Sequence, residues 1–238
     1  MCPPGIASSE IAARLSVVRE RIARAAERGR RDPASVTLVA VSKTFGVEQV
    51  RAAADAGQID FGENKVQEAL QKIDRTSDLH LRWHLVGHLQ TNKARKAAVF
   101  NVIHSVDSDP LLARIDQAAT ETGRTVDLLV QVDLAGEATK HGAREADLRA
   151  IFEAGRRCRS TRIVGLMLLP PAARDPEEAR SYFRALRGVR DRLLAGGVEA
   201  SMLRHLSMGM SHDFEVAVEE GATLVRVGTA IFGERSYV

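Results

Sequence analysis

Short apolar runs alternate along most of the chain with longer stretches in which apolar residues recur at helical spacing. Runs such as TLVAV, VDLLVQV and IVGLMLL are apolar at almost every position, which is typical of strands buried on both faces. Eight strands are predicted: Val36–Val41, Ile59–Phe61, Arg82–Val86, Val102–Ser105, Asp127–Asp133, Arg162–Leu168, Leu203–Leu206 and Thr223–Val227. Eight units without a long polar linker predict an α/β fold, a closed (β/α)8 barrel of the TIM type. The alternative, an open doubly wound sheet, would normally have fewer units and a glycine-rich first turn.

The segment before the first strand has the spacing of one amphipathic helix. Apolar residues stand at positions 11, 15, 18 and 22, within a stretch from Ile6 to about Gly29. This stripe predicts a helix packed beneath or beside the barrel. We therefore expect a single domain over residues 1–238, in which residues 1–30 form an added N-terminal helix.

Three further helices have recognisable start signals. Asp109-Pro110 and Asp175-Pro176 each combine a capping residue with proline at the first helical position. The first of these helices should end at Gly123, and the second near Ala195. Ser211 is expected to cap a short helix near the C-terminus.

Composition and charge place the chain among ordinary cytoplasmic proteins. Of its 238 residues, 45% are hydrophobic and 27% are charged, and no apolar run approaches the roughly 18 residues of a membrane span. The N-terminus lacks the pattern of a secretory signal, and only Cys2 and Cys158 are cysteines, so no disulfide framework is implied. Much of the excess positive charge lies in Arg19–Arg31. We interpret it as a solvated helix face, with a nucleic-acid contact as the alternative.

Candidate chemistry gathers where the predicted strands end, because the active face of such barrels lies at the carboxyl ends of the strands. Lys43 ends the first strand. After the seventh strand, the sequence LSMGMS offers the Ser207 hydroxyl, the flexible Gly209 and the start of the helix at Ser211. The eighth strand is followed by Gly228-Thr229, so the last two loops predict a phosphate cradle.

A lysine opposite a phosphate cradle predicts a ligand that has both a phosphate and a carbonyl group. Pyridoxal 5′-phosphate (PLP) meets this description when it is held on Lys43 as a Schiff base. Arg226, inside the last strand, is then a candidate neighbour of the pyridine nitrogen. An ion pair between Arg226 and Glu63 is the alternative interpretation.

Along nearly its whole length, the sequence resembles the pyridoxal phosphate homeostasis protein family. The motifs that carry the resemblance are LVAVSKT, FGEN followed by VQEA, WHLVGHLQTNK, GLM and LSMGMSHDFEVAVEEGATLVRVGTAIFG. The resemblance implies a barrel related to the N-terminal domain of alanine racemase, with PLP on Lys43. It implies that Asn64 lies near the ring, that Arg226 faces the pyridine nitrogen, and that Ser207, Gly228 and Thr229 contact the phosphate. Met167, in the GLM motif, is also a candidate cofactor-binding residue.

The resemblance implies a protein without established catalytic turnover. We expect it to buffer or deliver PLP, to serve acceptor PLP enzymes or small amines, and to be a monomer. The alternative is a PLP-dependent enzyme such as an amino-acid racemase, which needs an acid or base on each face of the substrate carbon. Tyr182 and Tyr237 are the only tyrosines, in a predicted helix and at the terminus, and this argues against racemisation.

Three further features of the sequence accompany these motifs. Lys65 stands where the family commonly has an aromatic residue, and Lys140 is either a second amine for cofactor exchange or a surface lysine. His80, His84 and His88 recur every four residues, but the segment is predicted to be strand and turn, so we expect no metal site there. His84 is instead predicted to form a hydrogen bond near the barrel mouth.

Overall fold

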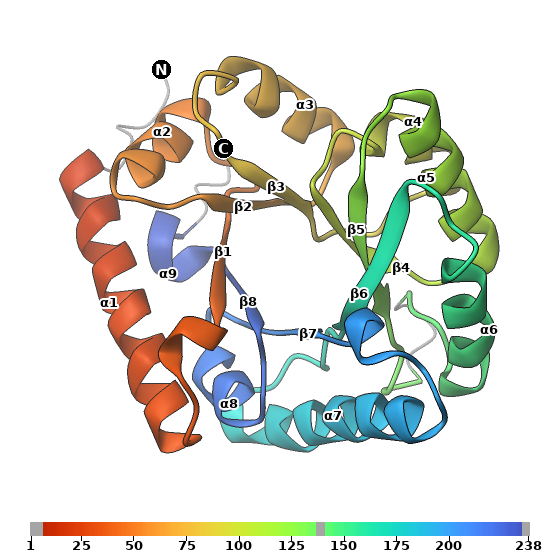
Figure 1. The fold of residues 1–238 in the computed structure, drawn as a ribbon. Helices are drawn as coiled ribbons and strands as arrows, with labels where there is room; N and C mark the ends of the chain where they lie inside the picture. The colour runs from red at the N-terminus through yellow and green to blue at the C-terminus, as the bar shows by residue number, and fades with distance from the viewer. Residues whose placement is uncertain (1–6, 137–140, 235–238) are drawn as a thin grey trace.

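Eight parallel strands form a closed barrel in chain order, in a computed structural model that describes residues 7–136 and 141–234 (Figure 1). The strands are β1 (Thr37–Val41), β2 (Asp60–Glu63), β3 (Arg82–Leu85), β4 (Val102–Val106), β5 (Val126–Gln131), β6 (Thr161–Met167), β7 (His205–Met210) and β8 (Leu224–Val227). β1 pairs with both β2 and β8, so the sheet has no edge. The predicted (β/α)8 barrel is confirmed, and the open doubly wound sheet is excluded.

Helices surround the barrel on its outer face (Figure 1). They are α1 (Ser8–Arg28), α2 (Val47–Asp55), α3 (Val66–Arg75), α4 (Ala94–Ala97), α5 (Asp109–Glu121), α6 (Glu145–Gly155), α7 (Arg180–Ala195), α8 (Phe214–Glu219) and α9 (Thr229–Phe232). Short 3-10 turns are η1 (Pro33–Ser35), η2 (Thr91–Lys93), η3 (Pro176–Ala179) and η4 (Ala200–Met202). As predicted, Asp175 caps a helical segment that ends at Ala195, although its first turn is the 3-10 turn η3.

The predicted N-terminal helix is present as α1, and its apolar stripe is buried. Its arginines, however, are not only a solvated face. Arg21 lies 2.7 Å from Glu215, and Arg31 donates to the carbonyl oxygens of Val218 and Ala222. The arginine-rich segment therefore fixes α1 against α8, beside which it lies in Figure 1.

Part of the barrel interior is filled by apolar side chains from several strands. This inner cluster consists of Val39, Val102, Leu129, Val164, Met167 and Leu224, all buried. The larger outer core lies between strands and helices. Within the described part of the chain, no helix combines the length and apolar character needed to cross a membrane.

The seventh strand differs from the prediction, which ended it at Leu206. β7 continues to Met210, and its pairing with β8 shifts by one residue between Ser207 and Met210. Gly209 lies in this bulge with φ +90°, and a Cβ atom there would lie 2.6 Å from the Cβ of Ala217. The predicted loop is therefore a bulged strand, and a glycine allows β7 to approach α8.

The short helix near the C-terminus also begins later than predicted. α8 starts at Phe214 with Asp213 at the N-cap position, so Ser211 does not cap it. Asp213 instead accepts a hydrogen bond from the backbone N–H of Met210. The result is a loop, rather than a helix start, at Ser211.

Candidate functional site

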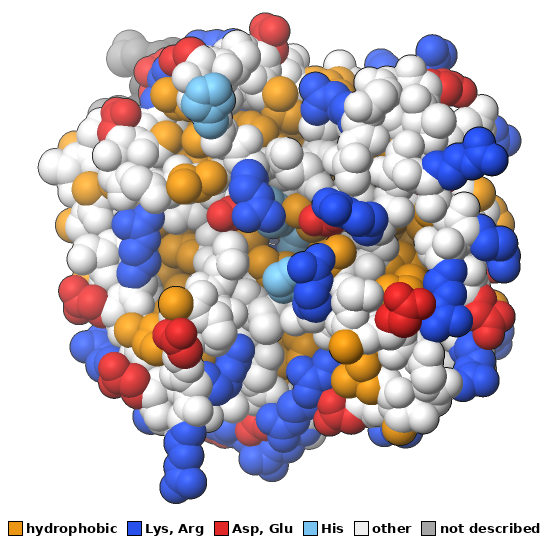
Figure 2. Space-filling model, viewed as in Figure 1, with side chains coloured by type: hydrophobic (Ala, Val, Ile, Leu, Met, Phe, Trp, Pro, Cys, Tyr) orange, Lys and Arg blue, Asp and Glu red, His pale blue; other side chains and the backbone are white. Residues whose placement is uncertain are grey.

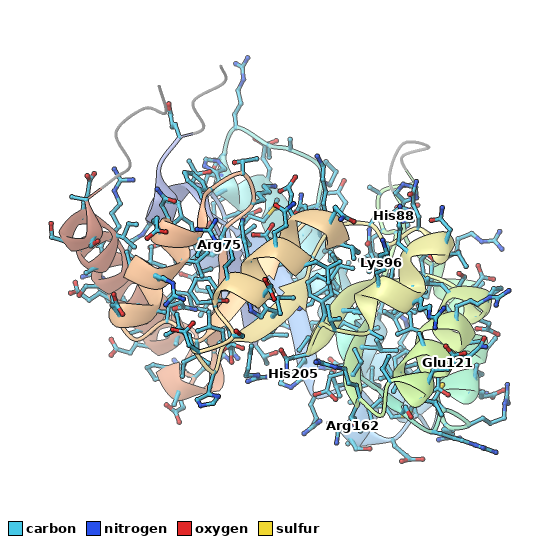
Figure 3. All side chains as sticks on the ribbon, turned by 90° about the horizontal axis from the view of Figure 1, so that it is seen from above. Arg75, His88, Lys96, Glu121, Arg162 and His205 are labelled. Atoms are coloured by element: carbon cyan, nitrogen blue, oxygen red, sulfur yellow. The ribbon has the colours of Figure 1, made fainter. Side chains whose placement is uncertain are left out.

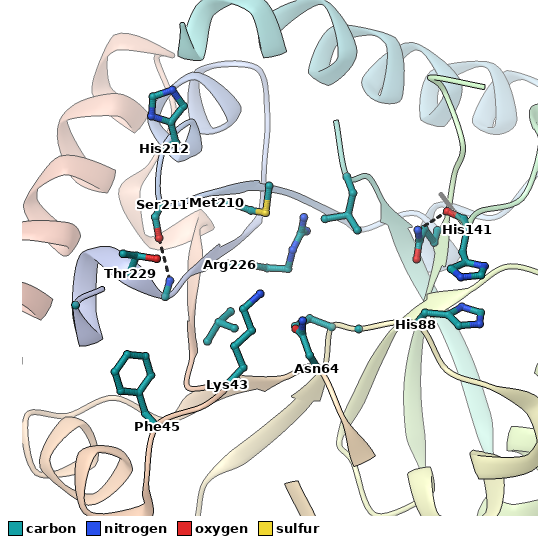
Figure 4. A pocket seen from close by; sticks show the side chains of 17 residues that line it. Lys43, Phe45, Asn64, His88, His141, Met210, Ser211, His212, Arg226 and Thr229 are labelled. Carbon is teal, nitrogen blue, oxygen red and sulfur yellow. Dashed lines mark hydrogen bonds between the residues drawn. The ribbon is translucent and has the colours of Figure 1, made fainter. Parts of the chain in front are cut away.

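A cavity of about 600 Å³ opens at the carboxyl ends of the strands, where the sequence predicted the active face (Figure 4). Its size is within the range of small-molecule sites. Five of the predicted residues line it: Lys43, Asn64, Arg226, Gly228 and Thr229. Among the described residues no aspartate or glutamate lines this cavity, whereas a lysine and an arginine do. The charge therefore favours an anionic ligand.

Met167 and Ser207 do not line the cavity. Met167 is fully buried in the apolar cluster inside the barrel. Ser207 is equally buried, because β7 does not end before it but carries it inside the barrel. The hydroxyl that reaches the pocket from this segment belongs to Ser211, four residues further on.

Lys43 enters the cavity from the turn that follows β1. Figure 4 shows its side chain extending from this turn toward the side of the pocket on which Arg226 lies. The next residue, Thr44, has φ +71°, a conformation that residues other than glycine rarely adopt. Phe45 follows, and its ring packs against that of Phe232 at 5.3 Å between centroids. The contact between Phe45 and Phe232 thus anchors the turn to α9.

A buried ion pair lies beneath this turn. Lys72 Nζ is 2.5 Å from Oε1 of Glu63, and it donates to the backbone oxygen of Ser42 at 2.7 Å. The Ser42 hydroxyl donates to the same Glu63 oxygen at 2.6 Å. Burial raises the pKa of Glu63, while the nearby Lys72 ammonium opposes that rise. Glu63 thus pairs with Lys72, and the alternative of an ion pair with Arg226 is wrong.

Arg226 points from β8 into the cavity and is held by neutral acceptors. It donates to the Ser207 hydroxyl oxygen at 2.6 Å and to the backbone oxygen of Leu168 at 2.9 Å. Burial lowers the pKa of Arg226 to about 10, so the side chain stays a cation at neutral pH. Its charge lies at the pocket without a carboxylate bound directly to it among the described residues.

One end of the pocket is built from hydroxyl groups and backbone. Ser211 Oγ accepts hydrogen bonds from the backbone N–H of Gly228 at 3.1 Å and of Ala230 at 3.5 Å (Figure 4). Thr229 is the first residue of α9 and also lines the cavity. The loops after β7 and β8 are thus tied together where the sequence predicted a phosphate cradle.

Asn64 is positioned by a close backbone contact. A Cβ atom at Gly87 would lie 2.2 Å from the backbone oxygen of Asn64, so only glycine allows the loop after β3 to approach so closely. Lys65, the next residue, is an exposed N-cap of α3 whose amine lies 3.4 Å from Glu68. Lys140 lies outside the described residues.

Two histidines that sequence reasoning did not place there form the opposite rim. The rings of His88 and His141 stack with 3.5 Å between centroids and 9° between planes (Figure 4). Burial, and then the neighbouring His141, lower the pKa of His88. Asp107 is close enough that the three residues offer ligand atoms within 4.8 Å of one another. An imidazole binds a metal in its ring plane, and two parallel stacked rings share no such plane, so the cluster would have to rearrange to hold an ion.

The other histidines of the repeating pattern do not join this rim. His80 is exposed, and His84 is buried inside the barrel, where it forms hydrogen bonds to Asp60 and His104. Its hydrogen bonding is confirmed, but His104 lies in the barrel interior and Asp60 at the amino end, so neither partner is at the mouth. Histidines inside otherwise apolar strands, as in RWHL and VIHSV, were the available signal for this interior site.

Comparisons with known proteins identify related sequences. The profile described as "Alanine racemase, N-terminal domain" matches residues 14–236. The chain is 44% identical to a pyridoxal phosphate homeostasis protein of Aquifex aeolicus, over 94% of this chain and 98% of that protein. It is 42% identical to one of Pseudomonas aeruginosa, over 96% and 97% of the two chains.

Solved structures show the same relationship. PipY of Synechococcus elongatus, determined with PLP bound, superimposes with a TM-score of 0.83 and 42% identity, covering 94% of this chain and all of PipY. Alanine racemase of Clostridium difficile gives a TM-score of 0.71 at 15% identity, and this chain covers 58% of it. The second likeness shows the shared barrel fold alone.

Proposed function

The chain belongs to the alanine racemase N-terminal domain family, and on this premise we propose that it binds PLP and acts in its homeostasis. In this proposal, Lys43 Nζ holds the cofactor's aldehyde as a Schiff base at the mouth of the barrel. The protein buffers the cofactor or delivers it to acceptor PLP enzymes and small amines, without turnover of its own. The proposal places it in the cytoplasm as a monomer, and the monomer is supported by the fact that one chain supplies every residue that the proposal uses.

The observation that carries the proposal is the placement of one amine and one guanidinium in a single cavity. Lys43 and Arg226 line the same pocket as the hydroxyl-bearing residues Ser211 and Thr229. PLP supplies an aldehyde that condenses with a primary amine, together with a phosphate dianion and a pyridine nitrogen. The residues present fit these three groups, and the absence of acid side chains from the described lining fits the phosphate.

Each residue has a distinct role in this proposal. Ser211, Thr229 and the backbone at Gly228 bind the phosphate, while Asn64 contacts the ring. Arg226 donates to the pyridine nitrogen. Since a guanidinium has no acceptor, it favours an unprotonated pyridine nitrogen, which makes the ring a weaker sink for electrons. This suits a protein that holds the cofactor more than one that uses it to stabilise carbanions.

Absorbance of the purified protein with PLP tests the proposal. We expect a visible band at one equivalent of PLP, and we expect Lys43→Ala to lose it. Lys65→Ala is the matched control, because Lys65 is an exposed lysine nearby and should leave the band unchanged. Retention of the same band and stoichiometry by Lys43→Ala would reject the Schiff base assignment.

The racemase alternative makes a different prediction. Two-base racemisation needs a second acid or base opposite the lysine. Tyr182 lies on α7, outside the pocket lining, and Tyr237 lies beyond the described residues. We therefore expect no steady α-deuteration when the PLP-loaded protein is incubated with L-amino acids in D2O. Exchange at enzymatic rates would favour the alternative.

A further inference from the structure

A continuous chain of buried hydrogen bonds runs through the barrel from its amino end to the pocket. Oδ1 of Asp60 lies 2.9 Å from Nε2 of His84, and Nδ1 of His84 lies 2.9 Å from Nε2 of His104. Nδ1 of His104 lies 2.8 Å from Oγ of Ser207, which accepts from Arg226 at 2.6 Å. Four hydrogen bonds thus link a carboxylate to the guanidinium that lines the pocket.

The two ends of this chain lie on opposite sides of the barrel. Asp60 begins β2, and its side chain is 14% exposed and 3.5 Å from Arg82. Figure 3 places His205 and Arg162, which lie near the starts of their strands, on the side opposite His88 at the pocket rim. The amino-end face is the one that Figure 2 shows, with histidine in a central hollow surrounded by acidic and basic side chains. The interior members His84, His104 and Ser207 are buried.

The charge states of the members fix which atom donates in each bond. Burial lowers the pKa of His84 and lowers that of His104 much further, so both rings are neutral and carry one N–H each. The Asp60 carboxylate can only accept, so His84 bears its proton on Nε2. Nδ1 of His84 must then accept from His104, which therefore bears its proton on Nε2 as well.

The same reasoning extends to the pocket. Nδ1 of His104 has no proton and accepts from the Ser207 hydroxyl. This leaves the Ser207 oxygen to accept from Arg226, which cannot accept from anything. All four bonds then point the same way, from the guanidinium to the carboxylate. No bond is left without a donor, and no proton has to move.

We propose that Asp60 is a remote positioning residue, which orients the His84–His104–Ser207 chain so that Ser207 holds Arg226 at the pocket. The orientation of the chain is a property of the protein without cofactor. Its effect on PLP rests on the proposed function, in which Arg226 contacts the pyridine ring. Without the carboxylate, the Nε2 proton of His84 has no acceptor. Moving the proton of both rings to Nδ1 gives every imidazole N–H an acceptor again, but it makes Ser207 accept twice and leaves the hydroxyl proton of Ser207 unpaired.

Histidine tautomers, read by long-range ¹H–¹⁵N correlation on the cofactor-free protein, test the orientation. We expect the Nε2–H tautomer for both His84 and His104 in the natural protein, and Nδ1–H for both in Asp60→Leu. Asp60→Asn retains an accepting oxygen and should restore Nε2–H. Asp127→Leu is the matched control, because Asp127 also pairs with an arginine at this end (Arg162, 2.9 Å) but is not one of the residues whose hydrogen bonds form the chain. An Nδ1–H tautomer for either ring in the natural protein would overturn the inference, even if Asp60→Leu does not fold.

Equilibrium binding of PLP tests the positioning itself. Loss of one optimally placed hydrogen bond should weaken PLP binding by about three- to tenfold in Asp60→Leu, with Asp60→Asn and Asp127→Leu within about twofold of the natural protein. Unchanged affinity in Asp60→Leu, with altered tautomers, would overturn the positioning role. Failure of the natural protein to bind PLP would reject the proposed function instead, and the tautomers would still decide the orientation.

Discussion

Lys72 and Arg226 are buried cations near the pocket, and their hydrogen-bond partners differ in charge. Lys72 lies 2.5 Å from a buried carboxylate, that of Glu63, beneath the turn that carries Lys43. Within the described part of the chain, Arg226 has only neutral acceptors, the Ser207 hydroxyl and the Leu168 carbonyl. A buried cation with its own carboxylate has little charge left for a ligand, whereas one held by neutral groups keeps its charge available. The first is therefore part of the fold, and the second is part of the site.

The largest effect should come from breaking the pair that belongs to the fold. Lys72→Met leaves Glu63 buried without its cation, and we expect the free energy of unfolding to fall by about 3–5 kcal/mol in urea titrations. The double variant Lys72→Met/Glu63→Leu removes both charges and should recover most of this loss. If the free energy of unfolding of Lys72→Met fell by less than about 1 kcal/mol, the pair would not have the structural role assigned to it.

Removing the other cation should affect binding more than stability. Arg226→Leu eliminates a buried charge that has no carboxylate partner among the residues that the structure describes, so we expect the free energy of unfolding to change by no more than about 1–2 kcal/mol. PLP affinity should fall by about tenfold or more, because charge-assisted hydrogen bonds are the stronger ones. Equilibrium dialysis and urea unfolding of the same variant measure the two effects. If Arg226→Leu unfolded readily yet bound PLP normally, Arg226 would belong to the fold, as Lys72 does, and not to the site.

The chain that holds Arg226 should also appear in the pH dependence of stability. Burial keeps the pKa of His104 well below 6.5 in the folded state, so below pH 6.5 the unfolded chain binds a proton that the folded protein does not. Stability should thus fall as the pH drops below about 6.5. His104→Gln should reduce this slope by about 1.4 kcal/mol per pH unit.

The exposed His80 provides a matched control for that slope. Comparing the slopes of His104→Gln and His80→Gln separates the effect of removing a buried ring from that of removing an exposed one. Equal slopes for His104→Gln and the natural protein would show that the buried ring is protonated in the folded state. That result would remove the basis for the hydrogen-bond directions.

The contrast between the two cations could be predicted only in part from the sequence. The barrel follows from local patterns, because eight apolar runs alternate with helices, and Lys43 ends the first run. The placement of Arg226 at the pocket was also expected. The partner of Glu63 was not, because Lys72 lies on the neighbouring helix and only tertiary packing reveals the contact.

The bulge in β7 is a second feature that could not be predicted from the sequence, and it explains why Ser207 was expected where Ser211 lies. A glycine in an apolar run is consistent with either a turn or a bulge, and the choice depends on how closely α8 approaches. Sequence reasoning took it as a turn and therefore placed Ser207 at the mouth. His84 and His104 come from different strands, so their spacing in the sequence gave no sign of their contact.

Lys43 is the residue on which the proposed function depends, and covalent trapping tests it most directly. The PLP-loaded protein is reduced with borohydride, digested, and its peptides are analysed by mass spectrometry. We predict one pyridoxyl group for each chain, carried by the side chain of Lys43. A group found on another lysine, or no stable group after reduction of a PLP-saturated sample, would contradict the proposal.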